Sequence, residues 1–476
     1  MAAPARYDAV VVGSGPNGLS GAIVLAQAGL SVLVLEANDM PGGGARSAEL
    51  TLPGFVHDVC SAVHPLGIGS PFLRTLPLRD HGLEWIDQPS AVTHPFDDGT
   101  AAVLERSVEA TAKSFGRDAR AYSALMQPLV DDWLNVYRET LGPLHIPRRP
   151  LALARFGLRG LLATTWLTKA MFKTPRPRAL FAGIAAHATL PLSQPPSAAF
   201  GLVLGLAGHA VGWPIPRGGS GNISRALVSY LRSLGGEVVT NTRVESLDHL
   251  PSSRLVLLDV TARQVLRLAG DRLPPLYRGQ LRHFRYGLGT FKVDWALDGP
   301  IPWRAPECNR AATVHIGGTL EEIAASHDDG WAGKSPERPY VLLAQPTLFD
   351  RSRVPDDRHH IAWAYCHVPN GGSVDMTDRI EAQVERFAPG FRDRVVARHT
   401  MGPAELERCN ANLVGGDIGG GEVNLLQLLT RPTLRLNPYA TPLPNVFVCS
   451  SSTPPGGGVH GMCGYHAARA ALASLR

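Results

Sequence analysis

One pattern near the start of the chain constrains the fold more than any other feature. The apolar run Asp8–Val12 leads into the loop Gly13–Gly18 (GSGPNG), a helical apolar pattern follows, and a second apolar run, Ser31–Leu35, ends at Glu36. Strands that are buried on both faces of a parallel sheet read as continuous apolar runs of this kind. The order of strand, glycine loop, helix, strand and terminal acid predicts a Rossmann-like βαβ unit that binds a dinucleotide.

Each residue type in this unit has a physical reason. Gly13 permits the tight turn, Gly15 lets the backbone approach a pyrophosphate, and Gly18 lets the helix pack closely against the strand. The amino terminus of the helix presents free N–H groups and a positive dipole end to the phosphates. We expect Ser14 and Pro16, which lie between the glycines, to line the same site.

Glu36 closes the unit at the end of the second strand. Its carboxylate is placed to accept hydrogen bonds from ribose hydroxyls, and Ala37 follows it in the same site. A carboxylate at this position also repels a 2′-phosphate, so the pattern disfavours NADP.

A second glycine-rich segment follows Glu36 closely. Pro41-Gly42-Gly43-Gly44-Ala45-Arg46 brings bare backbone near the same pyrophosphate, through Gly42 and Gly43. Arg46 either pairs with the phosphates in bidentate fashion or is a surface charge.

The far end of the chain repeats the arrangement of strand, glycine loop and helix. The apolar run Asn445–Cys449 leads into Ser450–Gly461 (SSSTPPGGGVHG), and a helical pattern follows. NAD needs one such crevice, whereas FAD is longer and commonly takes contacts from both chain ends. The two loops together therefore favour FAD as the cofactor.

These motifs resemble the phytoene desaturase branch of the FAD-dependent amine oxidase and desaturase superfamily. Within it they are most similar to the group named after pyridine nucleotide-disulfide oxidoreductase domain-containing protein 2. The resemblance is carried by the three glycine segments, by Gly54–Pro65 and by Phe291–Trp295, and it spans nearly the whole chain. No cysteine pair is present to perform the disulfide chemistry in that group's name.

The resemblance implies further cofactor contacts. The backbone at Val244 is implied to touch the adenine ring. Many relatives carry an acid after the final strand to hold the ribityl chain, and here Ser450-Ser451 stand in its place, where a hydroxyl can still donate. The residues implied to lie near the isoalloxazine or the ribityl chain are Ser451, Gly457, Gly458, Val459 and His460.

The predicted fold class is α/β, with a Rossmann-like FAD-binding domain and a mixed α+β substrate domain. Residues 1–75, 210–265 and 425–476 are expected to form the discontinuous FAD-binding domain. Residues 76–209 and 266–424 are expected to form the substrate domain, a sheet covered by helices. A length of 476 residues also favours two domains over one core.

Net charge and cysteine content limit the partners and the cellular compartment that we expect. A net charge of +5 is small for this length and argues against nucleic-acid binding. The six cysteines are too sparse for a disulfide framework and read as free thiols in a reducing compartment. The first strand begins near Tyr7, which leaves no room for a signal peptide. We expect a cytoplasmic protein.

The segment 151–178 adds a possible contact with lipid. No Asp or Glu occurs between positions 139 and 237, although basic residues are frequent there. Drawn as one helix, 151–178 places its charges on one arc opposite an apolar face, which is typical of a helix lying on a membrane surface or of a solvated face on a covering helix. The charges exclude a spanning helix. They are Arg155, Arg159, Lys169 and Lys173.

The expected reaction is abstraction of hydride from a C–H bond of an apolar, polyene or lipid-like substrate to flavin N5. His460 and Lys292 are the acid–base candidates, against a hydrogen-bonding or positional role. No metal-binding pattern is present. The alternatives are a redox-neutral, flavin-dependent isomerase of double bonds and a non-catalytic flavin-binding assembly partner. Substrate identity, electron acceptor and oligomeric state stay open.

Overall fold

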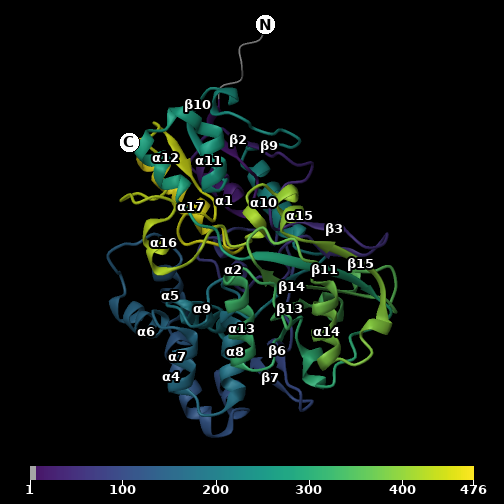
Figure 1. Cartoon of the computed structure of the whole chain (residues 1–476). Helices are drawn as coiled ribbons and strands as arrows, with labels where there is room; N and C mark the ends of the chain where they lie inside the picture. Colours follow the sequence, from purple (N-terminus) through teal and green to yellow (C-terminus); the bar gives the residue numbers. More distant parts are fainter. Residues whose placement is uncertain (1–6, 476) are drawn as a thin grey trace.

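A computed structural model describes residues 7–475, which are built around two main β-sheets (Figure 1). The first sheet is parallel, with five strands in the order β16-β10-β1-β2-β9. The apolar runs of the sequence form the inner strands, which are covered on both faces, whereas β9 at the edge of the sheet is partly exposed. The five strands are β1 (Tyr7–Val12), β2 (Val32–Leu35), β9 (Glu237–Val239), β10 (Ser253–Leu258) and β16 (Val446–Val448).

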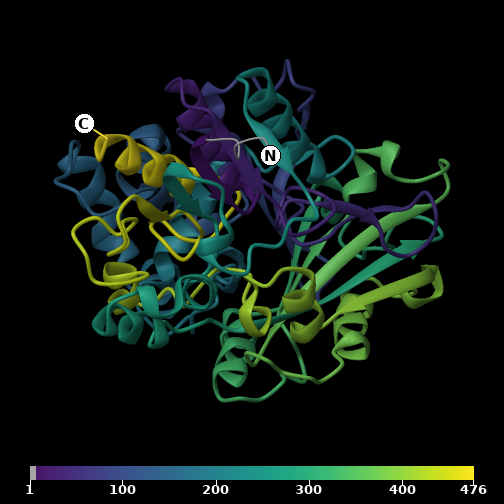
Figure 2. The same ribbon diagram turned by 90° about the horizontal axis from the view of Figure 1, so that it is seen from above.

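Helices from opposite ends of the chain cover this sheet together. α1 (Pro16–Gln27) packs against α17 (Met462–Ala473) and α10 (Gly221–Ser233). A side chain on Gly464 would overlap the backbone of Asn17, so the small residue permits the close crossing of α17 and α1. Seen from above, the carboxyl-terminal helix lies next to the amino-terminal elements (Figure 2). The first sheet and its cover therefore need both ends of the described chain.

The second sheet has seven strands in the order β15-β11-β14-β13-β12-β6-β7, all antiparallel except the pair β12–β6. One face packs on α14 (Thr377–Phe387) through a core that includes Val293 and Trp295. The opposite face carries Trp363 and Tyr365 toward a cavity. The strands are β6 (Ser90–Pro95), β7 (Ala101–Glu105), β11 (Gly289–Leu297), β12 (Thr313–Ile316), β13 (Val341–Ala344), β14 (His360–Val368) and β15 (Val395–Met401).

A bundle of helices flanks the second sheet, on the lower left in Figure 1. Its centre is α9 (Ser197–Ala210), and His209 on α9 is a satisfied core residue that bonds Tyr122 Oη at 2.8 Å. The other helices on this side are α3 (Val108–Lys113), α4 (Ala119–Val130), α5 (Trp133–Thr140), α6 (Pro150–Gly160), α7 (Thr164–Met171), α8 (Pro175–Ala185) and α13 (Leu320–Trp331).

Short elements join these parts. Two small antiparallel sheets pair β3 with β4 and β5 with β8. The bounds are β3 (Ser47–Glu49), β4 (Val56–Asp58), β5 (Trp85–Ile86), β8 (Ile215–Pro216), α2 (Pro65–Ile68), α11 (Ala262–Ala269), α12 (Pro275–Arg282), α15 (Pro403–Cys409) and α16 (Leu425–Thr430).

The predicted fold class is confirmed: a parallel Rossmann-like sheet stands beside a mixed sheet with covering helices. The strands of the first sheet come from the segments 7–75, 210–265 and 425–475, and those of the second from the intervening ones. α11 and α12 also pack on β10 and β16, so the elements around the first sheet continue past the predicted boundary at 265. Residues 1–6 and 476 lie outside the described part.

The expectation of one continuous helix over 151–178 is wrong. α6 ends at Gly160, α7 begins at Thr164, and the chain breaks again before α8. The first N–H groups of α7 bond elsewhere, since Thr164 N donates to Ser197 Oγ at 2.9 Å and Thr165 N donates to the Leu192 carbonyl at 3.1 Å. The four basic side chains therefore do not share one helical face. Within residues 7–475, no helix combines the length and apolar character needed to cross a bilayer.

Candidate functional site

The loop between β1 and α1 forms one wall of a large cavity. Gly13 takes the positive φ of +98° that the tight turn requires, and a side chain on Gly18 would overlap the carbonyl oxygen of Gly13. α1 begins at Pro16 with Gly15 as its N-cap, and its first turn has no acidic residue. The loop residues from Gly13 to Asn17 line the cavity, so the positive end of the helix faces it.

Glu36 lies at the end of β2 with its carboxylate almost fully buried. Oε2 accepts from Ser14 N at 3.0 Å and from Ser14 Oγ at 2.6 Å, and Oε1 accepts from Asn38 N at 2.9 Å and Asn38 Nδ2 at 3.1 Å. The two backbone donors hold the carboxylate in place, whereas the two side-chain donors can be exchanged for hydroxyls of a ligand. Ala37 and Val244 line the same end of the cavity.

The carboxyl-terminal loop forms the facing wall. It leaves β16, runs to α17, and packs so closely on a neighbouring loop that a Cβ on Gly457 would lie 2.7 Å from the Gly419 carbonyl oxygen. Its cavity-lining residues are Ser450, Ser451, Pro455, Gly457, Gly458, Val459 and His460.

His460 is the polar side chain of this loop with an unused donor. Its Nδ1 accepts from Met462 N at 3.0 Å, so the proton of the neutral ring is on Nε2. Nε2 is buried and has no hydrogen-bond partner among residues 7–475. Burial lowers the pKa of His460 to about 4, which keeps the imidazole neutral at physiological pH. Because Nε2 itself is inaccessible, this N–H lies behind the cavity wall, and the ring supports the loop from within.

The two glycine loops line one continuous cavity of about 870 Å³. Gly15 and Gly457 both belong to its wall although they stand near opposite ends of the sequence. Between them lie the segment Cys60–Gly67 and the segment Arg408–Leu413. The predicted loops are thus brought together around a space within the range of small-molecule and cofactor sites.

Three predicted cofactor residues lie outside the cavity wall: Gly18, Gly42 and Arg46. The Arg46 guanidinium is buried and occupied, because Nε donates to the Gly43 carbonyl at 2.9 Å and Nη2 to Cys409 Sγ at 2.9 Å. It ties the Pro41–Arg46 turn to Cys409, the last residue of α15. Arg46 supports the wall residue Gly43 and is not a surface charge, and its pairing with phosphates stays a prediction.

Lys292 also lies behind the wall. Its ammonium is buried, forms an ion pair with Asp294, and lies 5.5 Å from the ring centroid of Trp363. Trp363 and the neighbouring Tyr365 do line the cavity. The indole of Trp363 therefore separates Lys292 from the cavity.

Sequence reasoning missed Asp259, which follows β10 and lies against the glycine loop. Its Oδ2 accepts from Gly18 N at 2.9 Å, and the residue lines the cavity. Burial raises the pKa of Asp259 to about 7. An acid directly after a buried strand was the available signal, because ligands of open parallel sheets bind at the carboxyl ends of the strands.

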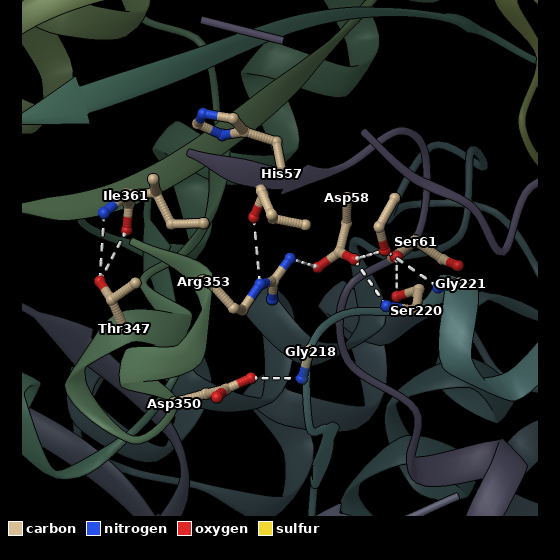
Figure 3. A network of polar contacts seen from close by, with 12 residues as sticks. His57, Asp58, Ser61, Gly218, Ser220, Gly221, Thr347, Asp350, Arg353 and Ile361 are labelled. Atoms are coloured by element: carbon tan, nitrogen blue, oxygen red, sulfur yellow. Dashed lines mark hydrogen bonds and ion pairs between the residues drawn. The ribbon is translucent and has the colours of Figure 1, made fainter. Parts of the chain in front are cut away.

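A buried polar network holds the segment Cys60–Gly67 in place (Figure 3). Asp58 at the end of β4 forms an ion pair with Arg353 Nη2 at 2.7 Å, with both side chains fully buried, and accepts from Ser220 N at 2.7 Å. Ser220 Oγ bonds the Ser61 carbonyl and lies 2.8 Å from His64 Nε2. The network connects β4, the start of α10 and the segment 346–354 next to the second sheet.

The other end of the cavity is apolar. It extends between α6, α9 and α16, and it reaches the molecular surface at side chains that are both exposed and part of the wall. The apolar residues of this arm are Leu141, Leu144, Leu153, Phe156, Leu161, Ala199, Phe200, Val203, Leu204, Val423, Leu425, Leu428 and Leu429.

Known proteins share the fold and the sequence pattern. The family model described as an NAD(P)-binding Rossmann-like domain matches residues 11–74. Pyridine nucleotide-disulfide oxidoreductase domain-containing protein 2 of Rattus norvegicus is 26% identical, over 99% of this chain and 94% of its own length. The lycopene-forming phytoene desaturase of Pantoea ananas is 25% identical, over 97% and 98% of the two chains.

A solved structure extends the comparison. Cyclohexylamine oxidase from Brevibacterium oxydans superposes with a TM-score of 0.62 at 16% identity, over 98% of this chain and 99% of that one, which shows a shared fold. The resemblance inferred from the motifs is confirmed by these full-length similarities. The chain is an oxidoreductase that is similar over nearly its full length to these two proteins in sequence and to cyclohexylamine oxidase in fold.

Proposed function

We propose that this chain is an FAD-dependent oxidoreductase that removes hydride from a C–H bond of an apolar, polyene or lipid-like substrate. One observation carries the proposal. A single cavity is lined at one end by both glycine loops and at the other by an apolar arm that reaches the surface. A long cofactor and a greasy substrate can therefore lie end to end in one space, protected from bulk water.

The residues of the polar end fit FAD. Glu36 would hold the ribose, the loop Gly13–Pro16 at the start of α1 would hold the pyrophosphate, and Val244 would border the adenine. The isoalloxazine would border Ser451, Gly457 and Gly458, in the part of the cavity that Tyr365 also lines. When bound, the flavin supplies a two-electron acceptor.

The cavity wall contributes orientation and exclusion of water. Tyr365 and Trp363 present an aromatic surface opposite the carboxyl-terminal loop, stacked at a centroid distance of 5.7 Å. The buried Lys292–Asp294 ion pair lies behind them, outside the cavity wall, so these side chains would position the wall rather than carry a proton to substrate. Hydride removal accounts for one C–H bond, and a double bond forms only when the neighbouring carbon also loses a proton, which a water molecule in the cavity would accept.

An anaerobic titration tests the proposal. The purified protein is loaded with FAD, and the visible flavin band is followed while polyenes, oxygenated lipids and amines are added in turn. Bleaching by a polyene or lipid supports the proposal, and bleaching by amines alone points to an amine oxidase.

The remaining alternatives have their own outcomes in the same experiment. Conversion of a polyene without bleaching identifies the redox-neutral isomerase. FAD binding with no response to any of the substrates identifies the non-catalytic partner, which the open apolar arm disfavours. A colourless protein that does not take up FAD refutes the cofactor assignment.

A further inference from the structure

The mouth of the apolar arm is surrounded by exposed leucines. We name this surface the leucine rim and define it as Leu144, Ile146, Leu151, Leu158 and Leu161, together with Leu425, Leu426, Leu429, Leu434 and Leu436. Large apolar side chains are normally scattered singly over a soluble surface. Here they gather in two segments on the same side of the molecule, around α6 and around α16 (Figures 1 and 2).

The rim is continuous with the inside of the cavity. Leu144, Leu161, Leu425 and Leu429 line the cavity and are exposed to solvent at the same time. A molecule that leaves an apolar phase at the rim can therefore enter the arm without crossing water. The geometry provides an entrance rather than an isolated patch.

Helix α6 carries large apolar residues on its exposed side as well as on its buried side, whereas a helix that faces water is usually apolar on the buried side alone. Phe156 and Gly160 are buried against the molecule, whereas Leu151 and Leu158, two turns apart, face outward with 72% and 75% of their surface exposed. An amphipathic surface helix would carry polar residues on the outer face. The outer leucines of α6 therefore expose apolar surface that the rest of the described chain does not cover.

The charges around the rim identify the partner. Neither residues 140–236 nor residues 423–476 contain an Asp or Glu, and Arg148, Arg149 and Arg155 are exposed beside the leucines of α6. The acids that border these segments, Glu139 and Glu422, are buried, and Glu139 accepts from the backbone N–H groups of Arg148 and Arg149. Exposed leucines flanked by arginines match the acyl and headgroup layers of an anionic leaflet.

We infer that the leucine rim docks on an anionic lipid bilayer and that the apolar arm opens into that bilayer. Contact comes from two separate segments around the mouth and not from one basic helix over 151–178, which the structure divides. The inference goes beyond the redox chemistry proposed above, because docking needs no flavin.

Co-sedimentation with lipid vesicles tests the inference on the full chain. Vesicles of phosphatidylglycerol and phosphatidylcholine are compared with vesicles of phosphatidylcholine alone. We expect the protein to sediment with the anionic vesicles and to be partly released by salt. The double variants L151E/L158E and L426E/L436E are each expected to lower the partition coefficient at least ~10-fold, because each removes two inserted leucines.

A matched control replaces exposed valines far from the rim. V374E/V396E changes the charge by the same amount next to the second sheet and should leave vesicle binding unchanged. Flavin content is measured on every variant, so a failure of docking is distinguished from a failure of cofactor binding. Equal sedimentation of wild type and rim variants overturns the inference. So does a stable dimer in solution that the rim substitutions dissociate, since a second copy would then cover the leucines.

Discussion

Asp259 is expected to make FAD uptake depend on pH. Its carboxyl lies against the amino terminus of α1, in the wall where the pyrophosphate would bind. Burial raises the pKa of Asp259 to about 7, and the Glu36 carboxylate adds to the rise, whereas hydrogen bonds from Gly18 and Gly15 oppose it. A bound pyrophosphate brings a further negative charge and favours the protonated form. The complex should therefore hold a proton that the free protein loses above pH 7.

The size of the pH effect on FAD affinity follows from this coupling between proton binding and FAD binding. Below about pH 6 the carboxyl is protonated in both states, and the affinity for FAD is flat. Above the pKa, binding must restore the proton at a cost of about 1.4 kcal/mol per pH unit, which is a factor of ten in affinity. Between pH 7 and pH 8.5 the dissociation constant of FAD should rise ~15-fold. Asp259→Asn keeps the shape and an acceptor for Gly18 N but cannot ionise, so its affinity should stay constant.

Isothermal titration of the apoprotein with FAD measures both quantities. Experiments at pH 6, 7 and 8.5 in two buffers of different ionisation enthalpy give the affinity and the number of protons taken up. We expect uptake to approach one proton per FAD at pH 8.5 in the wild type and to vanish in D259N. The melting temperatures of the two apoproteins at pH 6 control for folding. Equal pH slopes in the two proteins, or proton release by the wild type, would refute the reasoning.

Three further predictions concern single side chains. His460→Ala removes the acceptor of Met462 N and the ring that lies against the wall residue Gly458, so it should weaken FAD binding ~2- to 10-fold in a fluorescence titration, and an unchanged constant contradicts this supporting role. Gly18→Ala places a methyl group on the Gly13 carbonyl and should yield protein with little flavin absorbance, whereas Gly279→Ala, which meets no atom within 4 Å, should not. Arg353→Met leaves the buried carboxylate of Asp58 without its partner and should lower the free energy of unfolding by about 3–5 kcal/mol. The effect is measured as a fall in melting temperature, which the double variant R353M/D58N should partly reverse. Equal melting temperatures of wild type and R353M would show that the pair is not stabilising.

The parts of the fold that depend on local patterns could be predicted from the sequence. The apolar runs at Asp8–Val12 and Ser31–Leu35 form β1 and β2, and the run at Asn445–Cys449 contains β16, because fully covered strands require continuous apolar residues. The glycine loops at Gly13 and Gly457 reach one cavity because each follows the carboxyl end of a strand in the same parallel sheet.

The parts that depend on distant contacts could not be predicted. The break between α6 and α7 exists because Ser197 Oγ and the Leu192 carbonyl bond the N–H groups of Thr164 and Thr165, and no local pattern in 151–178 encodes this. The position of Arg46 depends equally on Cys409, far along the chain. Side-chain partners across such separations become visible only in the folded chain.

The threading of the first sheet has a consequence for synthesis. β1 and α1 leave the ribosome before β16 and α17, yet β16 pairs with β10 and α17 packs on α1 only after residues 446–473 have followed. Until then these strands and the apolar face of α1 remain uncovered, and such surfaces invite aggregation. The nascent chain must be sheltered until residue 473 has been made, and a premature stop before residue 446 disables the nucleotide loop that precedes it.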